Sequence, residues 1–182
     1  MDVTGIILAG GKSSRMGQDK GLMLLNEKPM IQHVIDVLKP ITNQIIIIAN
    51  SKQYQQFGYP VYEDEVKDKG PVGGIYAGLS HTNTQKNIIV SCDTPHISSK
   101  LLVHLLAKSS EHEVTIPVFN NKVHPLIGVY KTNILPVFKE SLNQNQLKLM
   151  LVNQLLNTNI VLINENEFDA NNFKNYNSPN DF

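Results

Sequence analysis

The first twenty residues contain the feature that most constrains the fold, an apolar segment that leads directly into a glycine-rich, cationic loop. Residues 3–8 are mostly apolar and predict a buried strand, and three glycines follow within the next ten positions. The same stretch carries the side chains of Lys12, Arg15 and Lys20. Glycine lets backbone N–H groups come close to a phosphate, and the cations neutralise its charge. The stretch therefore predicts a nucleotide or other polyphosphate site at the carboxyl edge of a sheet, where open α/β folds bind ligands.

Two common nucleotide-binding motifs do not match this loop. A Walker A loop needs a glycine, four residues and then Gly-Lys-Ser or Gly-Lys-Thr. Gly11, Lys12 and Ser13 supply its end, but Ile6 stands where the first glycine is required. The dinucleotide fingerprint G-x-G-x-x-G fails as well, because Gly10 is followed directly by Gly11. An ordinary glycine turn with solvated cations is the alternative, and the combination of strand, adjacent glycines and ordered cations favours the phosphate site.

Length, charge and cysteine content limit the classes of protein to consider. A chain of 182 residues with 41% hydrophobic residues predicts one globular domain over 1–182. Sixteen basic and sixteen acidic residues give zero formal charge, so we expect no nucleic-acid partner. No apolar run approaches the ~20 residues of a membrane span, so we expect no membrane partner. The single cysteine excludes an internal disulfide and fits a reducing compartment, so we expect a cytoplasmic protein.

The rest of the chain alternates between predicted strands and predicted helices. Apolar runs predict strands at residues 45–48, 61–62, 88–90, 114–119, 126–130 and 160–163. Apolar periodicity predicts helices at residues 30–38, 75–79, 101–106, 134–142 and 147–156, with a second glycine-rich turn at 70–74. Such alternation predicts an α/β fold, a three-layer α/β/α sandwich around a mainly parallel, Rossmann-like sheet.

Asp93 is the strongest candidate for catalysis outside the loop. It follows the predicted strand 88–90, so we expect it at the same sheet edge as the glycine-rich loop. Carboxylate oxygen is the ligand that Mg²⁺ prefers, and Mg²⁺ commonly takes one or two carboxylates together with substrate phosphate oxygens. A turn-forming or helix-initiating aspartate before Pro95 is the alternative. Cys92 next to it is interpreted as a small, buried, inert side chain rather than a nucleophile.

The stretch from Leu8 to Lys20, L-A-G-G-x-S-x-R-M-G-x-D-K, resembles the signature loop of the molybdenum cofactor guanylyltransferases. The opening L-A-G-G is common to a larger group of nucleotidyltransferases, whereas the tail from Arg15 to Lys20 is typical of the cofactor branch. Residues 92–95, C-D-T-P, resemble the metal-binding C-D-x-P segment of the family. Residues 70–74 resemble its guanine-binding G-P-L-x-G segment, with Val72 in place of leucine.

Two further segments resemble the part of the family that binds the acceptor. Residues 124–126, H-P-L, match an H-P-x segment that precedes a strand. Residues 175–179, N-Y-N-S-P, match a terminal N-x-N-T-P segment, with serine in place of threonine.

Asp64 lies upstream of the guanine segment, where the family has an aspartate that contacts the nucleotide. The resemblance therefore extends over essentially the whole chain.

The resemblance implies a fold of the nucleotide-diphospho-sugar transferase type and the transfer of GMP from GTP to the terminal phosphate of molybdopterin, with release of pyrophosphate. It implies Mg²⁺ as cofactor, held by Asp93, and transient contact with other proteins of molybdenum cofactor biosynthesis. The implied catalytic residues are Arg15, Lys20 and Asp93. The implied nucleotide-binding residues are Leu8, Ala9, Gly10, Gly11, Lys12, Lys20, Asp64, Gly70, Pro71 and Asp93. The implied acceptor-binding residues are His124, Asn175 and Asn177.

Two other functions are compatible with these residues. One is a sugar-phosphate or cytidylyl nucleotidyltransferase on the same fold. The other is a nucleotide-binding regulatory module that carries out no transfer. Asp93 together with the cationic loop favours an enzyme over the module, because binding alone needs no metal carboxylate.

Overall fold

The computed structural model describes residues 2–10, 19–63 and 69–177. In this part of the chain, eight strands form one sheet in the order β10-β7-β9-β6-β1-β4-β5, with β8 paired to β7. Ladders that involve β8 or β9 are antiparallel, and the others are parallel. The strands are β1 (Val3–Leu8), β4 (Gln44–Ile48), β5 (Val61–Tyr62), β6 (Lys86–Ser91), β7 (Val114–Phe119), β8 (Lys122–Val123), β9 (Ile127–Lys131) and β10 (Thr158–Leu162). The predicted mainly parallel sheet is confirmed.

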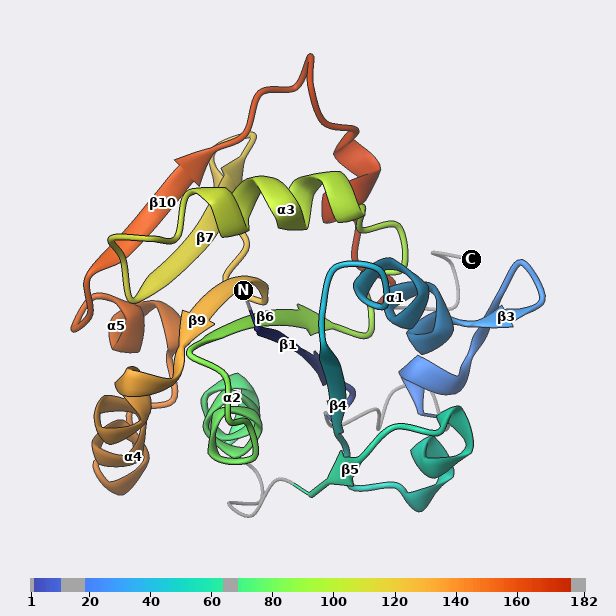
Figure 1. Cartoon of the computed structure of the whole chain (residues 1–182), viewed down its shortest axis with the longest axis horizontal. Coiled ribbons are helices and arrows are strands. Elements are labelled where there is room, and N and C mark those ends of the chain that lie inside the picture. The colour runs from blue at the N-terminus through green and yellow to red at the C-terminus, as the bar shows by residue number, and fades with distance from the viewer. Residues whose placement is uncertain (1, 11–18, 64–68, 178–182) are drawn as a thin grey trace.

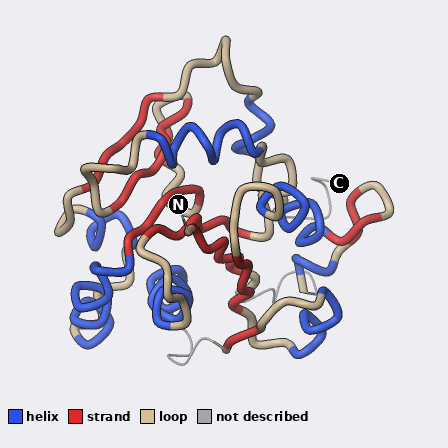
Figure 2. Tube along the Cα trace, viewed as in Figure 1, coloured by secondary structure: helices blue, strands red, loops and turns tan. Residues whose placement is uncertain are grey.

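Helices cover both faces of this sheet, so the predicted three layers are confirmed (Figures 1 and 2). Helices α1 (Met30–Leu38) and α3 (Ser99–Ala107) lie on one face. Helices α2 (Gly70–Ser80), α4 (Leu135–Asn143) and α5 (Leu149–Asn153) lie on the other. Short 3₁₀ segments are η1 (Lys20–Leu22), η2 (Lys52–Phe57), η3 (Thr132–Ile134) and η4 (Ala170–Phe173), and β2 (Leu24–Leu25) pairs with β3 (Lys28–Pro29) in a separate hairpin. Over the described ranges, no helix is both long enough and apolar enough to cross a membrane.

The central strands are buried on both faces. In β4, Ile45 and Ile47 pack toward α1 and α3, while Ile46 and Ile48 pack toward α2 and α4. The exposed fraction of each of these four side chains is at most 4%. A strand covered on both faces needs apolar side chains at every position, which explains the unbroken isoleucine run in the sequence.

The predicted glycine-rich turn at 70–74 is wrong, because helix α2 already begins at Gly70. Pro71 occupies the first turn of the helix, where its missing N–H costs no intrahelical hydrogen bond. Gly70 has a φ of +59°, a left-handed backbone conformation that glycine adopts without strain. A further mismatch is α5, which covers Leu149–Asn153 and is shorter than the predicted helix 147–156.

Two glycines bring α2 close to β1 and reveal the direction in which the helix runs. A Cβ added to Gly74 would lie 3.4 Å from Leu8 Cδ2, and one added to Gly78 would lie 2.6 Å from Ile6 Cγ2. The beginning of α2 therefore packs near the carboxyl end of β1, and its later turns pack further back along the strand. This arrangement brings Gly70 and Pro71 to the sheet edge where residues 9 and 10 emerge.

Candidate functional site

The candidate site lies at the carboxyl ends of β1 and β6. The chain passes from β1 to β4 and β5 on one side and then returns to β6 on the other. Such a reversal makes a topological switch point between β1 and β6, the place where open α/β sheets bind ligands. Hydrogen bonding between neighbouring strands continues one residue beyond the ends of β1 and β6. Ala9 N donates to Ile48 O at 2.9 Å, and Cys92 N donates to Leu8 O at 3.0 Å. Ala9 and Gly10 on β1 and Asp93 after β6 therefore emerge at neighbouring positions.

Asp93 has a carboxylate oxygen that the surrounding protein does not satisfy. Its Oδ1 is buried, and within the described residues it accepts no hydrogen bond. An unpaired buried carboxylate oxygen is costly, so it points to a cationic ligand. In the described ranges no group of three or more His, Cys, Asp or Glu gathers into a metal site. The unpaired oxygen of Asp93 fits an ion such as Mg²⁺, which can take one protein carboxylate and complete its shell with phosphate oxygens and water.

Cys92 lies beneath the site and is chemically inert there. Burial is the main factor that raises the pKa of its thiol, and the nearby carboxylates of Asp93 and Asp19 raise it further. The ammonium group of Lys20 acts in the opposite direction and does not outweigh them. A thiol held protonated is a poor nucleophile, in agreement with the interpretation of Cys92 as structural.

The C-terminal segment, at Tyr176 and Asn177, contacts both Asp93 and Lys20 at the end of the glycine-rich loop. Tyr176 N donates a hydrogen bond of 2.9 Å to the backbone oxygen of Asp93. At the next residue, Asn177 Oδ1 accepts a hydrogen bond of 3.0 Å from Lys20 Nζ. Two consecutive residues therefore contact both the end of the glycine-rich loop and the aspartate after β6. The structure brings together Lys20, Asp93 and Asn177, which sequence analysis had assigned to three separate motifs.

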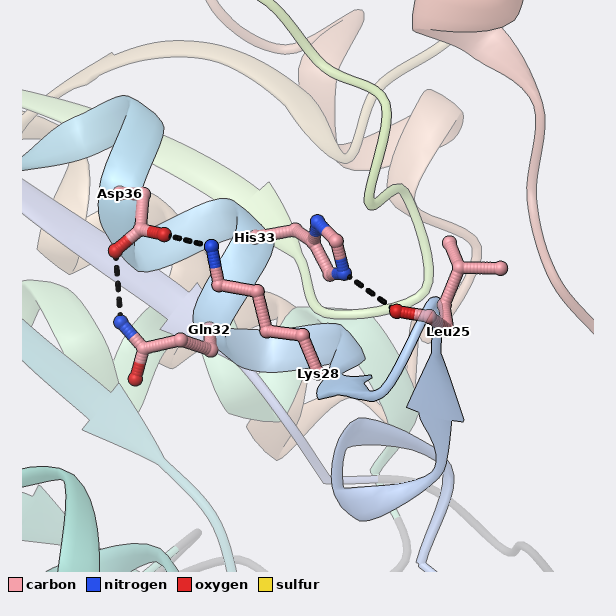
Figure 3. A network of polar contacts seen from close by, with 5 residues as sticks. All are labelled: Leu25, Lys28, Gln32, His33 and Asp36. Atoms are coloured by element: carbon pink, nitrogen blue, oxygen red, sulfur yellow. Dashed lines mark hydrogen bonds and ion pairs between the residues drawn. The ribbon is translucent and has the colours of Figure 1, made fainter.

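The chain that follows Lys20 is held against α1 by a polar network (Figure 3). His33 Nε2 donates to the backbone oxygen of Leu25 at 3.0 Å, which secures the β2–β3 hairpin. Asp36 accepts hydrogen bonds from Lys28 and from Gln32, the latter at 2.8 Å. Burial acts to raise the pKa of Asp36, but the hydrogen bonds from Lys28 and Gln32, together with the charges of Lys28 and His33, outweigh it and lower the pKa overall. The network fixes the β2–β3 hairpin against α1.

Two of the predicted nucleotide-binding residues, Gly70 and Pro71, lie at the beginning of α2. Gly70 and Pro71 are both exposed, so the first backbone groups of the helix face solvent at the site edge. A helix N-terminus carries partial positive charge and unpaired N–H groups, which favours an anionic or acceptor-rich ligand. Lys69, directly before the helix, donates through Nζ to Asn145 Oδ1 at 2.8 Å. This contact ties the start of α2 to the loop after α4.

His124, one of the predicted acceptor residues, packs against Phe173 of the C-terminal segment. The ring centroid of His124 is 4.7 Å from that of Phe173, and Phe173 stacks on Phe119 at 4.5 Å. Burial lowers the pKa of His124, and the charge of Lys122 lowers it further, so the imidazole is neutral near pH 7. Asn175 follows shortly after Phe173 and is exposed. The structure therefore places the His124 segment and the C-terminal segment on the same part of the surface.

Four predicted residues, Gly11, Lys12, Arg15 and Asp64, lie outside the described residues.

Sequence analysis missed several contacts that hold the C-terminal segment. His96 Nε2 and the hydroxyl of Tyr176 are hydrogen-bonded at 2.7 Å, and Asn172 Oδ1 accepts from Ser98 N at 2.8 Å. Nothing in the local sequence pattern signals these pairs, because each joins positions more than 70 residues apart.

Several curated proteins are similar to this chain along most of its length. A Flavobacterium johnsoniae protein named "probable molybdenum cofactor guanylyltransferase" is 48% identical over 149 residues, which is 81% of this chain and 78% of that protein. A Vibrio parahaemolyticus protein named molybdenum cofactor guanylyltransferase is 38% identical over 179 residues, 96% of this chain and 90% of that protein.

Solved structures share the fold. A protein from Aquifex aeolicus superposes with a TM-score of 0.82 at 27% identity, over 96% of this chain and 93% of its own. Molybdopterin-guanine dinucleotide biosynthesis protein A from Archaeoglobus fulgidus has a TM-score of 0.82 at 22% identity, over 98% of this chain and 94% of its own. The family model of the MobA-like NTP transferase domain matches residues 5–158. This chain therefore belongs to the MobA-like NTP transferase family.

Proposed function

We propose that this protein is a molybdenum cofactor guanylyltransferase, which transfers GMP from GTP to the terminal phosphate of molybdopterin. The observation that carries the proposal is the position of Lys20 and Asp93 at the β1–β6 switch point, bonded to two consecutive residues of the predicted acceptor segment. Relatives with this name, similar along most of the chain, support the choice of substrates.

In the proposed reaction, an oxygen of the molybdopterin phosphate attacks the α-phosphorus of GTP, and the bond from that phosphorus to the bridging oxygen of pyrophosphate breaks. The acceptor phosphate is already ionised near neutral pH, so no general base is needed. The protein positions two anions and offsets the charge that develops between them. Lys20 neutralises the α-phosphate, and Arg15 with Lys12 holds the departing pyrophosphate.

Asp93 is the residue that would hold Mg²⁺, through its unpaired carboxylate oxygen. When bound, such an ion draws electron density from phosphate oxygens and offsets their charge. His124, Asn175 and Asn177 would orient the acceptor, and the exposed beginning of α2 at Gly70 and Pro71, together with Asp64, would bind guanine. Each of these roles stays a prediction that substitution can test.

Pyrophosphate release from GTP by the purified full chain, with and without molybdopterin, tests the proposal. We expect release only when molybdopterin is present, and loss of release when EDTA removes magnesium. A panel of the four ribonucleoside triphosphates labelled in the α-phosphate separates guanylyl transfer from cytidylyl or sugar-phosphate chemistry. Binding of GTP without any release in the presence of the acceptor would favour a non-catalytic module instead.

A further inference from the structure

Tyr54 is a buried tyrosine whose hydroxyl lies directly beneath the candidate nucleotide site. It belongs to η2, drawn as the teal coil beside β5 in Figure 1, and its exposed fraction is 0%. Its ring packs in the apolar cluster shared by β1, β4 and α1. Burial is the main factor that raises the pKa of Tyr54 far above its ordinary value, so the hydroxyl keeps its proton and remains a hydrogen-bond donor at any pH used for an assay.

The Tyr54 hydroxyl contacts both ends of the glycine-rich stretch. It donates a hydrogen bond to Asp19 Oδ1, and the backbone oxygen of Ala9 lies 3.4 Å from it. Ala9 is where β1 ends, and Asp19 directly precedes Lys20. Ala9 lies 45 positions before Tyr54 and Asp19 lies 35 positions before it, so only the tertiary structure brings both against the same hydroxyl.

Gly21, which directly follows Lys20, packs so closely against this hydroxyl that there is no room for a side chain. A Cβ added to Gly21 would lie 2.5 Å from the Tyr54 hydroxyl oxygen and 3.2 Å from Cys92 Sγ. Real Cβ atoms essentially never show a contact as short as the one with the Tyr54 hydroxyl, so this close approach requires glycine. Lys20 is therefore flanked by two residues, Asp19 and Gly21, that both rest against Tyr54.

We propose that Tyr54 is a positioning residue for the nucleotide: its hydroxyl holds Ala9 and Asp19 together and so directs the ammonium group of Lys20 toward the α-phosphate. The hydroxyl itself touches no substrate, since it is fully covered by protein. A fixed Lys20 costs less conformational entropy on binding than a free one, which favours nucleotide affinity. This inference rests on the proposed nucleotide site and adds a residue that belongs to none of its motifs.

Tyr54→Phe in the full chain tests the inference, because it removes only the hydroxyl. We expect the Kd of a fluorescent GTP analogue and the KM for GTP to rise about tenfold, the effect of losing one hydrogen bond to a charged group. The Kd and the KM are measured on folded protein at a temperature well below its unfolding midpoint, so that a loss of stability alone leaves both unchanged. The matched control is Tyr59→Phe, which removes a hydroxyl from a half-buried ring just after η2, and we expect it to bind like the wild type.

Substitution of Asp19 provides a second, independent test of the inference. Asp19 is only half-buried, so its substitution does not disturb the core. Asp19→Asn keeps an oxygen that can accept from Tyr54, so it should retain more GTP affinity than Asp19→Ala. Tyr54→Phe combined with Asp19→Ala should be no worse than the more damaging single variant, because both remove the same bond. Wild-type affinity in Tyr54→Phe, or additive losses in the double variant, would overturn the inference. Failure of the wild type to bind GTP would instead overturn the proposed function.

Discussion

Lys20 Nζ donates a hydrogen bond of 3.0 Å to Asn177 Oδ1, although 157 positions separate the two residues in the chain. Lys20 ends the stretch predicted to bind the nucleotide, and Asn177 belongs to the segment predicted to bind the acceptor. One contact therefore connects the residues assigned to the two substrates. The residue before Asn177 bonds to the backbone of Asp93, so the C-terminal segment contacts both Lys20 and Asp93.

Asn177→Ala should raise the KM for GTP as well as the KM for molybdopterin, because Lys20 loses the partner that orients it. We expect increases of up to about tenfold, the effect of a hydrogen bond to a charged group. The matched variant is Asn175→Ala on the same exposed segment, which should raise only the KM for molybdopterin. Steady-state pyrophosphate release with each substrate varied in turn checks this. Identical patterns for the two variants would show that the contact has no role in nucleotide binding.

Lys20→Ala and Asp93→Asn should each lower turnover by about 10²-fold or more, the scale of losing one preorganised charge contact in the transition state. Lys52→Ala and Asp2→Asn remove the same charges at exposed positions outside the site and should leave turnover unchanged. The measurement is kcat for guanylyl transfer at saturating GTP and magnesium. If both site variants kept near wild-type turnover, the charge-neutralisation mechanism would be wrong.

Gly78→Ala should destabilise the protein even though alanine favours helices over glycine by about 1 kcal/mol. The new Cβ would lie 2.6 Å from Cγ2 of the fully buried Ile6, and overpacking of this kind costs roughly 1–3 kcal/mol. We expect a net loss of about 1 kcal/mol in the free energy of unfolding, measured by urea titration. Ser80→Ala, exposed on the same helix, should change it by less than about 0.5 kcal/mol. A more stable Gly78→Ala protein would mean that α2 can move away from β1.

Acidification should destabilise the protein in part through His124. Burial and then the charge of Lys122 lower the pKa of His124 in the folded state below its ordinary value of 6.5. The stability tied to the neutral imidazole is therefore present above pH 6.5 and is lost as the pH falls through the lowered folded value. Melting temperatures of the wild type and His124→Gln, recorded between pH 7.5 and 5, check this. The wild type should lose more on acidification, and parallel curves would contradict the prediction.

Much of the layered fold and the location of the site was already predictable from local sequence. The isoleucine run at 45–48 indicated a strand buried on both faces, and β4 is such a strand. The placement of Asp93 directly after a core strand predicted its position at the sheet edge. The beginning of α2 was misjudged, because its glycines were interpreted as a turn. One of them, Gly74, allows the helix to approach Leu8, as Gly78 further along allows it to approach Ile6, and that reason becomes visible only when both elements are present.

By itself the sequence determined which elements form and which residues carry charge to the β1–β6 edge, because burial pattern and residue chemistry are local properties. Only the tertiary structure decided which of these residues meet. The Tyr54 hydroxyl under Asp19, and Asn177 beside Lys20, join segments far apart in the chain. Such contacts depend on strand order and helix packing, which bring distant residues within bonding distance and which no short sequence window encodes.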